Sequence, residues 1–385
     1  MNRLYAGLPR TIFDVMSGLA RELSAVNLGQ GFPEEDGPAD LKEAVARATL
    51  EHSNQYPPMM GLPALREAVA EHYRRFQGVD LDWAREVTIT SGATEAIAAA
   101  ILATLNPGDE AILVEPMYDA YRPLVERAGG VARYVRLSPP DWRIPRDALK
   151  AAFSEKTRAI VLNSPVNPSA SLLVRADLEA IAEECIARNV IAICDEVWEH
   201  VTFDGGRHVS MLAIPGMRER TFKIGSAGKM FSMTGWKVGF LCAAPALTEV
   251  AAKAHQFLTF TTPPNLQMGA AYGLKKGEDY FVAMRAGFQR SRDRLAQALT
   301  QAGFAVLPCA GTYFLNIDLA RSGIALDAED FALRAVKEHG VASIPLTPFY
   351  AGAPPAQMLR LCFAKRDETL DRGVERLAAA RRTLA

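Results

Sequence analysis

The feature that most restricts the fold of this chain is the alternation of short apolar segments with longer helical patterns. The apolar segments are rich in β-branched residues and cover 87–91, 111–115, 132–137, 159–163, 190–195, 221–225 and 239–243. Most are hydrophobic on both faces, as buried parallel strands are, and helical patterns such as 175–188 lie between some of them. We therefore predict an α/β fold whose large domain has a mostly parallel, seven-stranded sheet between helices.

The length of the chain and a change of pattern near residue 275 indicate a second domain. With 385 residues, the chain exceeds the size at which one hydrophobic core keeps growing. A long helix is expected over 279–301, followed by strands near 312–317 and 358–363 and helices over 328–338 and 369–381. We predict a large domain over 51–278 and a smaller α+β domain over 279–385. Residues 1–50 are expected to form an N-terminal arm and part of the small domain.

Composition and charge give no reason to expect nucleic acid or a membrane as partner. The formal net charge is −1 and 49% of the residues are hydrophobic, so a small neutral or zwitterionic ligand fits better. The five cysteines form no CxxC pair, which favours reduced core thiols, and the six histidines lack the spacing of a zinc site, so no metal is expected. The sequence shows no signal peptide and no membrane-spanning run, which predicts a soluble, cytoplasmic protein.

One lysine stands in a spacing that points to chemistry. Lys229 lies three residues after Ser226 and eight before Lys237, between two apolar runs. Most lysines are solvated surface charges, so the spacing carries the hypothesis, and the residue type alone does not. A lysine that holds an aldehyde cofactor as a Schiff base has to lie next to the ligands of the cofactor's phosphate. Ser226 and Lys237 are the natural phosphate ligands.

Other chemically suggestive residues end or follow predicted strands, where ligands bind in parallel sheets. Asp195 closes an apolar strand, where a carboxylate is costly without a cation. A protonated pyridine nitrogen would be such a cation, and the structural alternatives are an ion pair within the protein or an N-cap. Residues 91–95, Ser-Gly-Ala-Thr-Glu, lie between a strand and a helix. They could bind a phosphate through free N–H groups, or simply cap the helix.

Three further residues have both a functional and a structural interpretation. Asn167, in the segment Asn-Ser-Pro-Val-Asn-Pro, could donate to a phenolic oxygen or belong to an ordinary turn. Tyr118 could stack on a flat cofactor ring or pack in the core. Arg360 is a single cation in an apolar strand, which suits a substrate carboxylate, although strand alternation also permits a solvated side chain.

Two rival motifs fail on their spacing. Residues 225–230 suggest a phosphate-binding P-loop, but they lack its four-residue spacing and end in Met instead of Ser or Thr. Residues 28–33 contain GxG without the third glycine of a dinucleotide fingerprint. The sequence therefore favours neither an NTPase nor a dehydrogenase.

Taken together, the chain resembles the class I, fold-type I pyridoxal-phosphate-dependent aminotransferases, most closely their kynurenine, glutamine and methionine branch. The segments that carry the resemblance are 27–33, 54–56, 164–168, 195–200, 226–239, 255–260 and 359–365, and it extends from residue 27 to about 377. It implies an aspartate-aminotransferase-like fold, pyridoxal 5'-phosphate as cofactor, and a homodimer with shared active sites.

The resemblance also implies roles around the cofactor. Lys229 would bond to the aldehyde and shuttle a proton, Asp195 would pair with the pyridinium nitrogen, and Asn167 would contact the ring oxygen. Tyr118 would stack on the ring. The phosphate ligands would be the backbone of Ala93 and Thr94, the side chains of Ser226 and Lys237, and the partner subunit's Tyr56.

The substrate ligands follow from the same resemblance. Arg360, Asn167 and the backbone of Gly31 would take the substrate carboxylate. Phe13 and the partner subunit's Phe260 would line the side-chain pocket.

The chain departs from the family pattern at Trp198, where relatives usually have a tyrosine that bonds to the cofactor's ring oxygen. An indole can donate through N–H but can neither titrate nor accept. We expect a shifted pKa of the lysine–cofactor linkage in this chain, without loss of activity.

The predicted function is amino transfer from an L-amino acid to a 2-oxo acid by a ping-pong mechanism. The aromatic residues of the side-chain pocket suggest a methionine, aromatic, kynurenine or glutamine donor. The alternatives are a carbon–sulfur β-lyase on cysteine conjugates and an aspartate-type aminotransferase. A regulatory module is disfavoured because no basic helix-turn-helix segment is evident.

Overall fold

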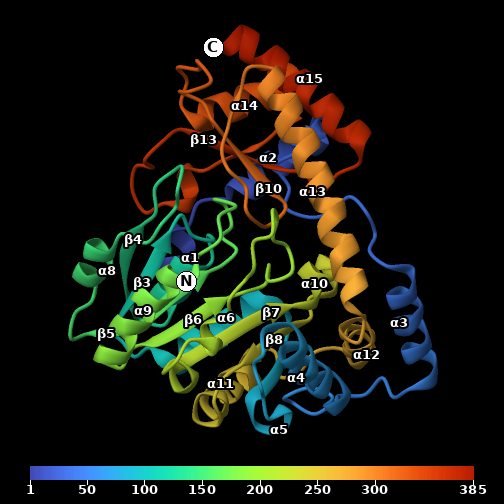
Figure 1. The fold of residues 1–385 in the computed structure, drawn as a ribbon, viewed down its shortest axis with the longest axis vertical. Helices are drawn as coiled ribbons and strands as arrows, with labels where there is room; N and C mark the ends of the chain where they lie inside the picture. The colour runs from blue at the N-terminus through green and yellow to red at the C-terminus, as the bar shows by residue number, and fades with distance from the viewer.

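The computed structural model describes residues 1–385, and its largest sheet has seven strands in the order β2-β8-β7-β6-β5-β3-β4 (Figure 1). In that order the strands are β2 (Val87–Thr90), β8 (Gly239–Cys242), β7 (Thr221–Ser226), β6 (Ile191–Asp195), β5 (Thr157–Asn163), β3 (Glu110–Glu115) and β4 (Val131–Arg136). Six of the strands run in the same direction, and β8 alone runs opposite to them. The prediction of a mostly parallel, seven-stranded sheet is confirmed.

Ten helices accompany the large sheet. They are α3 (Ala39–Glu51), α4 (Pro63–Gln77), α5 (Trp83–Glu86), α6 (Gly92–Thr104), α7 (Tyr121–Arg127), α8 (Arg146–Ala152), α9 (Arg175–Arg188), α10 (Ala227–Met230), α11 (Pro245–Leu258) and α12 (Pro264–Leu274). Helix α4 begins on Pro63 and ends before Gly78, whose positive φ terminates it. None of the helices in the chain combines the length and the apolar character needed to cross a membrane.

The C-terminal part contains a four-stranded antiparallel sheet in the order β12-β13-β10-β9. Its strands are β9 (Ala305–Val306), β10 (Phe314–Asp318), β12 (Ile344–Pro345) and β13 (Met358–Cys362), and its helices are α13 (Glu278–Gln301), α14 (Ala328–His339) and α15 (Asp367–Leu384). This part of the fold is α+β, as predicted. Long helix α13 runs from the large sheet to the C-terminal helices (Figure 1).

Most of the N-terminal segment packs on the C-terminal part of the chain, whereas its first helix contacts α7. It contains α1 (Arg3–Gly7), α2 (Ile12–Glu22) and β1 (Val26–Asn27), and β1 pairs in parallel with β11 (Val341–Ala342). Helix α2 packs against α14. Residues far apart in sequence therefore form one layer, and segments from both ends of the chain reach the region between the two sheets.

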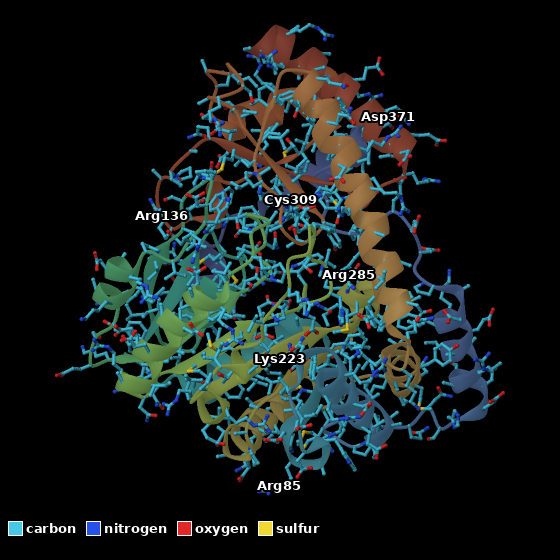
Figure 2. The ribbon with its side chains drawn as sticks, in the orientation of Figure 1. Arg85, Arg136, Lys223, Arg285, Cys309 and Asp371 are labelled. Carbon is cyan, nitrogen blue, oxygen red and sulfur yellow. The ribbon has the colours of Figure 1, made fainter.

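The two sheets share a continuous core. One cluster of buried hydrophobic residues includes Ile193 of the large sheet and Leu361 of the small one. At the junction, labelled in Figure 2, Arg136 donates to the carbonyl of Ala353 at 2.9 Å. The two parts are therefore held together by apolar packing as well as by the chain connections.

The parallel strands bring several polar residues to one edge of the large sheet. Asp195 and Ser226 are the last residues of β6 and β7, and Asn163 is the last residue of β5. Ser91 follows β2, and Tyr118 comes three residues after β3. Because these strands run in the same direction, their carboxyl ends meet at this edge.

Candidate active site

A cavity of about 550 Å³ lies at this edge of the large sheet and reaches residues of the small one. Twelve of the fourteen predicted site residues line it, namely Phe13, Gly31, Ala93, Thr94, Tyr118, Asn167, Asp195, Trp198, Ser226, Lys229, Lys237 and Arg360. The fold therefore gathers side chains from strand ends, from the N-terminal segment and from β13 around one space.

Lys229 lies on the short helix α10, directly after β7, and faces this cavity. Its Nζ donates to Tyr313 Oη at 3.3 Å and lies 4.8 Å from the centre of the Trp198 ring. Burial lowers the pKa of Lys229 to about 8. A lysine amine with a pKa near 8 is partly uncharged at neutral pH, as a nucleophile or a proton acceptor needs to be.

Asp195 is buried and lines the same cavity. Tyr121 donates its O–H to Asp195 Oδ2 at 2.6 Å, and the N–H of Val197 donates to Oδ1 at 3.4 Å. Burial raises the pKa of Asp195 to about 6. A buried carboxylate that has hydrogen bonds but lacks a cation in ion-pair contact suits a positively charged ligand group, such as a protonated ring nitrogen.

A backbone cradle for an anion lies at the N-terminus of α6. Gly92 has φ +76°, and a Cβ there would lie 3.2 Å from Lys237 Nζ. A Cβ on Gly239 would lie 2.5 Å from the carbonyl carbon of Gly92, so only glycine permits this close backbone approach. The free N–H groups of Ala93 and Thr94 follow at the positive end of the helix. Together with Lys237 and Ser226, this donor set fits the phosphate of the cofactor.

Arg360 is buried in β13 at the other end of the cavity, with 1% of its surface exposed. It donates to Asn167 Oδ1 at 2.7 Å and to the carbonyl of Gly29 at 3.1 Å, while its Nε has no partner. The ring of Phe314 lies 3.9 Å from the guanidinium carbon. Burial lowers the pKa of Arg360 to about 10. A buried guanidinium with neutral partners and an unused donor fits a carboxylate ligand.

Asn163 connects the strand ends to Asn167. Its side-chain N–H donates to the carbonyl of Asp195 at 2.8 Å, and its Oδ1 accepts from the N–H of Asn167 at 2.7 Å. The position of Asn167 is thus fixed from β5 and β6, and Asn167 in turn holds Arg360. These hydrogen bonds fix the position of the Arg360 guanidinium relative to the strand ends of the large sheet.

Tyr56 and Phe260 lie outside the cavity. Their rings contact each other at 5.5 Å between centroids, and 82% of Tyr56 and 39% of Phe260 is exposed. Neither can therefore reach the cavity of its own chain in this conformation. Their prediction as contributions from a partner subunit stays a prediction.

Several residues at or near the site were not among the predicted ones, and four of them bear on its chemistry. Tyr121 bonds to Asp195, Tyr313 bonds to Lys229, and Asp14 and Asp119 line the cavity. Tyr121 lies three residues from Tyr118 and could have been found from that spacing. Tyr313 comes from the second domain, 84 positions from Lys229, and nothing in its local sequence indicates the contact.

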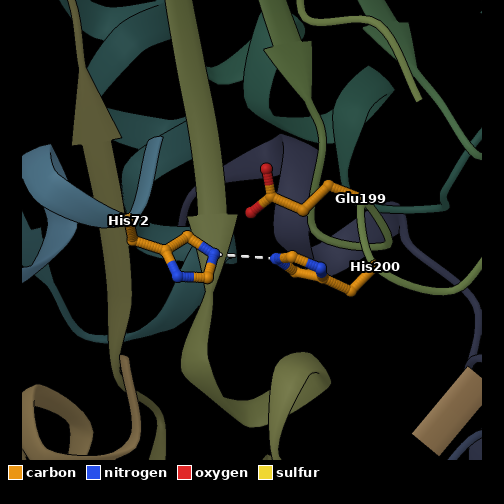
Figure 3. Close-up of side chains that lie close together, drawn as sticks. All are labelled: His72, Glu199 and His200. Atoms are coloured by element: carbon orange, nitrogen blue, oxygen red, sulfur yellow. Dashed lines mark hydrogen bonds between the residues drawn. The ribbon is translucent and has the colours of Figure 1, made fainter. Parts of the chain in front are cut away.

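A second buried polar group lies away from this cavity and contains His72, Glu199 and His200 (Figure 3). The two histidine Nε2 atoms are 2.7 Å apart, so one ring donates and the other accepts. Burial lowers the pKa of both rings, that of His72 to about 3, which keeps them neutral. The spacing of histidines in the sequence did not indicate this cluster, because His72 is 128 positions from His200.

Lys223 supplies the positive charge of the neighbouring network. Its Nζ lies 2.6 Å from Glu196 Oε2 and 2.7 Å from Glu199 Oε2, inside the large domain (Figure 2). His208 Nε2 contacts the same Glu196 carboxylate at 2.9 Å. The lysine ammonium contacts both carboxylates and so occupies the position that a metal cation would take. We therefore interpret the network as a structural ion-pair network and not as a metal site.

A family model described as aminotransferase class I and II matches residues 24–377 of this chain. The matched range includes both sheets and every residue that lines the cavity except Thr11, Phe13 and Asp14. The match therefore concerns the whole fold as well as the site.

The similarity to known proteins extends over almost the full length. The chain is 42% identical to methionine aminotransferase of Escherichia coli over 371 residues, 96% of each chain. It is 35% identical to the kynurenine–oxoglutarate transaminase of Dictyostelium discoideum, over 94% of this chain and 92% of that protein. The solved structure of N-succinyldiaminopimelate aminotransferase from Mycobacterium tuberculosis superposes with a TM-score of 0.95 at 42% identity, covering 99% of both chains.

Proposed function

Because this chain belongs to the class I and II aminotransferases, we propose that its amino donor is a neutral L-amino acid with an apolar or aromatic side chain. Methionine, phenylalanine, kynurenine and glutamine are the candidate donors, and a 2-oxo acid is the acceptor in a ping-pong reaction. The similarity to proteins named for methionine and kynurenine supports this choice. Pyridoxal phosphate is the cofactor of the family.

The charges around the cavity carry the proposal. Its only cations are Lys229, Lys237 and Arg360, and each has a task at the cofactor or at the substrate's α-carboxylate. The remaining ionisable carboxylates that face the space, beside Asp195, are Asp14 and Asp119. A donor with a second carboxylate would therefore meet negative charge and no free cation from this chain. A neutral side chain avoids that cost.

The chemistry divides among residues of this chain. The bound cofactor supplies an electron-withdrawing ring that takes up the electron pair left when the substrate's Cα–H bond breaks. The carboxylate of Asp195 stabilises the positive charge of the cofactor's ring nitrogen. Arg360 and Asn167 orient the substrate's carboxylate. Lys229 Nζ takes the proton that leaves Cα and, as an ammonium, can return it. One mobile amine is sufficient for both proton movements.

Donor specificity is tested by mixing the cofactor-loaded protein with single amino acids without an oxo acid. Loss of the visible absorption of the aldehyde form then reports the first half of the reaction. We expect methionine and phenylalanine to react at least roughly 100-fold faster than aspartate or glutamate. The reason is that a second substrate carboxylate left without a cation in the cavity should cost more than about 2.7 kcal/mol. Equal rates for aspartate and methionine would contradict the proposed donor class. Release of pyruvate and ammonia from cysteine conjugates, with little amino transfer, would identify a β-lyase instead.

The two carboxylates on the cavity wall, Asp14 and Asp119, give a more specific prediction. Asp119→Asn should raise the rate with aspartate by about tenfold, because it removes a negative charge from the cavity wall that would repel a second substrate carboxylate. The rate with methionine should change little. Asp80→Asn, a substitution of an exposed aspartate that does not line the cavity, is the matched control. An unchanged ratio of aspartate to methionine rates in Asp119→Asn would show that the carboxylate plays no part in selectivity.

The proposed assembly is a homodimer in which Tyr56 and Phe260 complete the cavity of the other subunit. A contiguous exposed apolar patch marks an interaction surface, and the exposed rings of Tyr56 and Phe260 contact each other. Phe257, three residues before Phe260 on the chain, is also exposed, with 86% of its surface accessible. We place the protein in the cytoplasm. All five cysteines are free and four are buried, which suits a reducing compartment.

A further inference from the structure

The phenol of Tyr313 lies between Lys229 and the backbone of Gly31. Lys229 Nζ donates to Tyr313 Oη at 3.3 Å, and Tyr313 donates its own O–H to the carbonyl of Gly31 at 2.8 Å. A phenol has one proton and can also accept. Because that proton is used by Gly31, an oxygen lone pair is free for the lysine nitrogen.

Two aromatic rings enclose the same nitrogen. The ring centroids of Trp198 and Tyr313 are 4.3 Å apart at an interplanar angle of 89°, and both side chains are buried. Lys229 Nζ lies 4.8 Å from the Trp198 centroid and 5.6 Å from that of Tyr313. Aromatic faces attract an ammonium but give it no directed hydrogen bond. Tyr313 Oη is thus the side-chain atom that can fix the direction of Nζ.

The position of Tyr313 is set by the second sheet. Tyr313 directly precedes β10, which pairs with β13 and aligns Asn316 with Arg360. Its neighbour Thr312 has φ +65° and donates its N–H to the carbonyl of Val201, beyond β6. The phenol is therefore held by both parts of the molecule, and its contact with Lys229 joins the carboxylate end of the site to the catalytic amine.

We propose that Tyr313 is a further catalytic residue, whose oxygen orients Lys229 Nζ and stabilises its ammonium form while the nitrogen is not bonded to the cofactor. The inference rests on the proposed role of Lys229. In a proton transfer, the nitrogen has to hold one proton facing the substrate's α-carbon without losing it to solvent. A fixed acceptor on the other side of Nζ satisfies that requirement.

The charges near Lys229 Nζ give the direction in which loss of the Tyr313 hydroxyl should shift the pKa of Lys229. Burial lowers the pKa of Lys229, as do the positive charges of Arg360 and Lys237, whereas a hydrogen-bond acceptor raises this pKa because it favours the ammonium. The other ionisable groups that act on Nζ are Asp195 of β6, Arg360 and Cys362 of β13, and Lys237. Removal of Tyr313 Oη leaves all of these in place, so the pKa of Lys229 should fall.

The test is Tyr313→Phe, which keeps the ring against Trp198 and removes one oxygen. After removal of the cofactor, the full-length protein is labelled with acetic anhydride across pH, and mass spectrometry follows the peptide that contains Lys229. The labelling rate of the wild type should rise with a midpoint near pH 8. The midpoint of the variant should lie about one unit lower, the size expected for one hydrogen bond to a charged group. With the cofactor bound, kcat should fall by about tenfold with little change in KM.

Tyr134→Phe, on β4 and away from the cavity, is the matched control and should leave both quantities unchanged. An unaltered labelling midpoint in a folded Tyr313→Phe protein would overturn the inference, even if activity fell, because a packing defect alone does not move that midpoint. Borohydride reduction of the loaded wild type, followed by peptide mapping, tests the premise separately. Cofactor found on a lysine other than Lys229 would refute the proposed function of Lys229, whereas cofactor on Lys229 with an unaltered midpoint would refute the role of Tyr313 only.

Discussion

Lys229→Ala is expected to lower the rate of amino transfer by roughly 10⁴-fold or more, because its one nitrogen is proposed to serve both as the attachment point of the cofactor and as the proton carrier. The other amine of the cavity, Lys237, faces the glycine cradle at Gly92 and cannot take over this position. Its proposed role is to bind the phosphate of the cofactor there. The variant should retain its fold, since Lys229 is at a cavity wall and makes one hydrogen bond, to Tyr313.

The measurement is kcat/KM with methionine and an oxo acid, with the protein loaded with cofactor by incubation. Lys253→Ala, an exposed lysine on α11, should behave like the wild type. Adding methylamine to Lys229→Ala should restore part of the proton transfer, because the small amine fits the space that the side chain leaves. Turnover of Lys229→Ala near the wild-type rate would mean that another group carries the proton.

The second large effect is expected for Asp195→Asn. Asparagine has nearly the same size, and its one amide oxygen can still accept the O–H of Tyr121, so the substitution removes the charge, preserves the shape and gives up only the long contact from the N–H of Val197. A buried cation that loses its partner costs about 3–5 kcal/mol, which corresponds to roughly 10²–10⁴-fold in rate. The positive charge affected is that of the cofactor's ring nitrogen, which Asp195 is proposed to stabilise.

Single-turnover rates with methionine separate this effect from weaker cofactor binding when the cofactor is saturating. Asp147→Asn on α8, which is exposed, controls for the loss of one carboxylate. If the single-turnover rate of Asp195→Asn lies within about twofold of the wild-type rate, the activation free energy differs by less than about 0.5 kcal/mol. This result would mean that the ring nitrogen of the cofactor does not pair with Asp195.

The strands of the large sheet were predictable because each is a short apolar run between polar turns. The segment predicted at 159–163 is β5 at Thr157–Asn163, and the helix predicted at 175–188 is α9 at Arg175–Arg188. The antiparallel direction of β8 was not predictable, since hydrophobic periodicity carries no information on strand direction. Strands β1 and β11 are two residues long and exist through their pairing.

The site was predictable where its residues lie at strand ends or close together in sequence. Asp195, Ser226 and Lys229 follow this pattern, and they line one cavity. Tyr313 and Asp14 do not, because their contribution depends on how the C-terminal sheet and helix α2 meet the large one. A polar residue that faces a cavity from another domain has the same local sequence as one that faces solvent.

The sequence by itself determined the family, the α/β fold and the residues proposed to hold the cofactor, because these depend on local spacing and on a hydrophobic pattern that specifies buried strands. Only the tertiary structure decided the surroundings of Lys229 and Asp195: Tyr313 with Trp198 around Nζ, Tyr121 on Asp195, and the acidic side chains of Asp14 and Asp119 on the cavity wall. Hydrogen bonds and charges act over a few ångströms of space, and residues from distant parts of the chain come that close only when both sheets have packed on their common core.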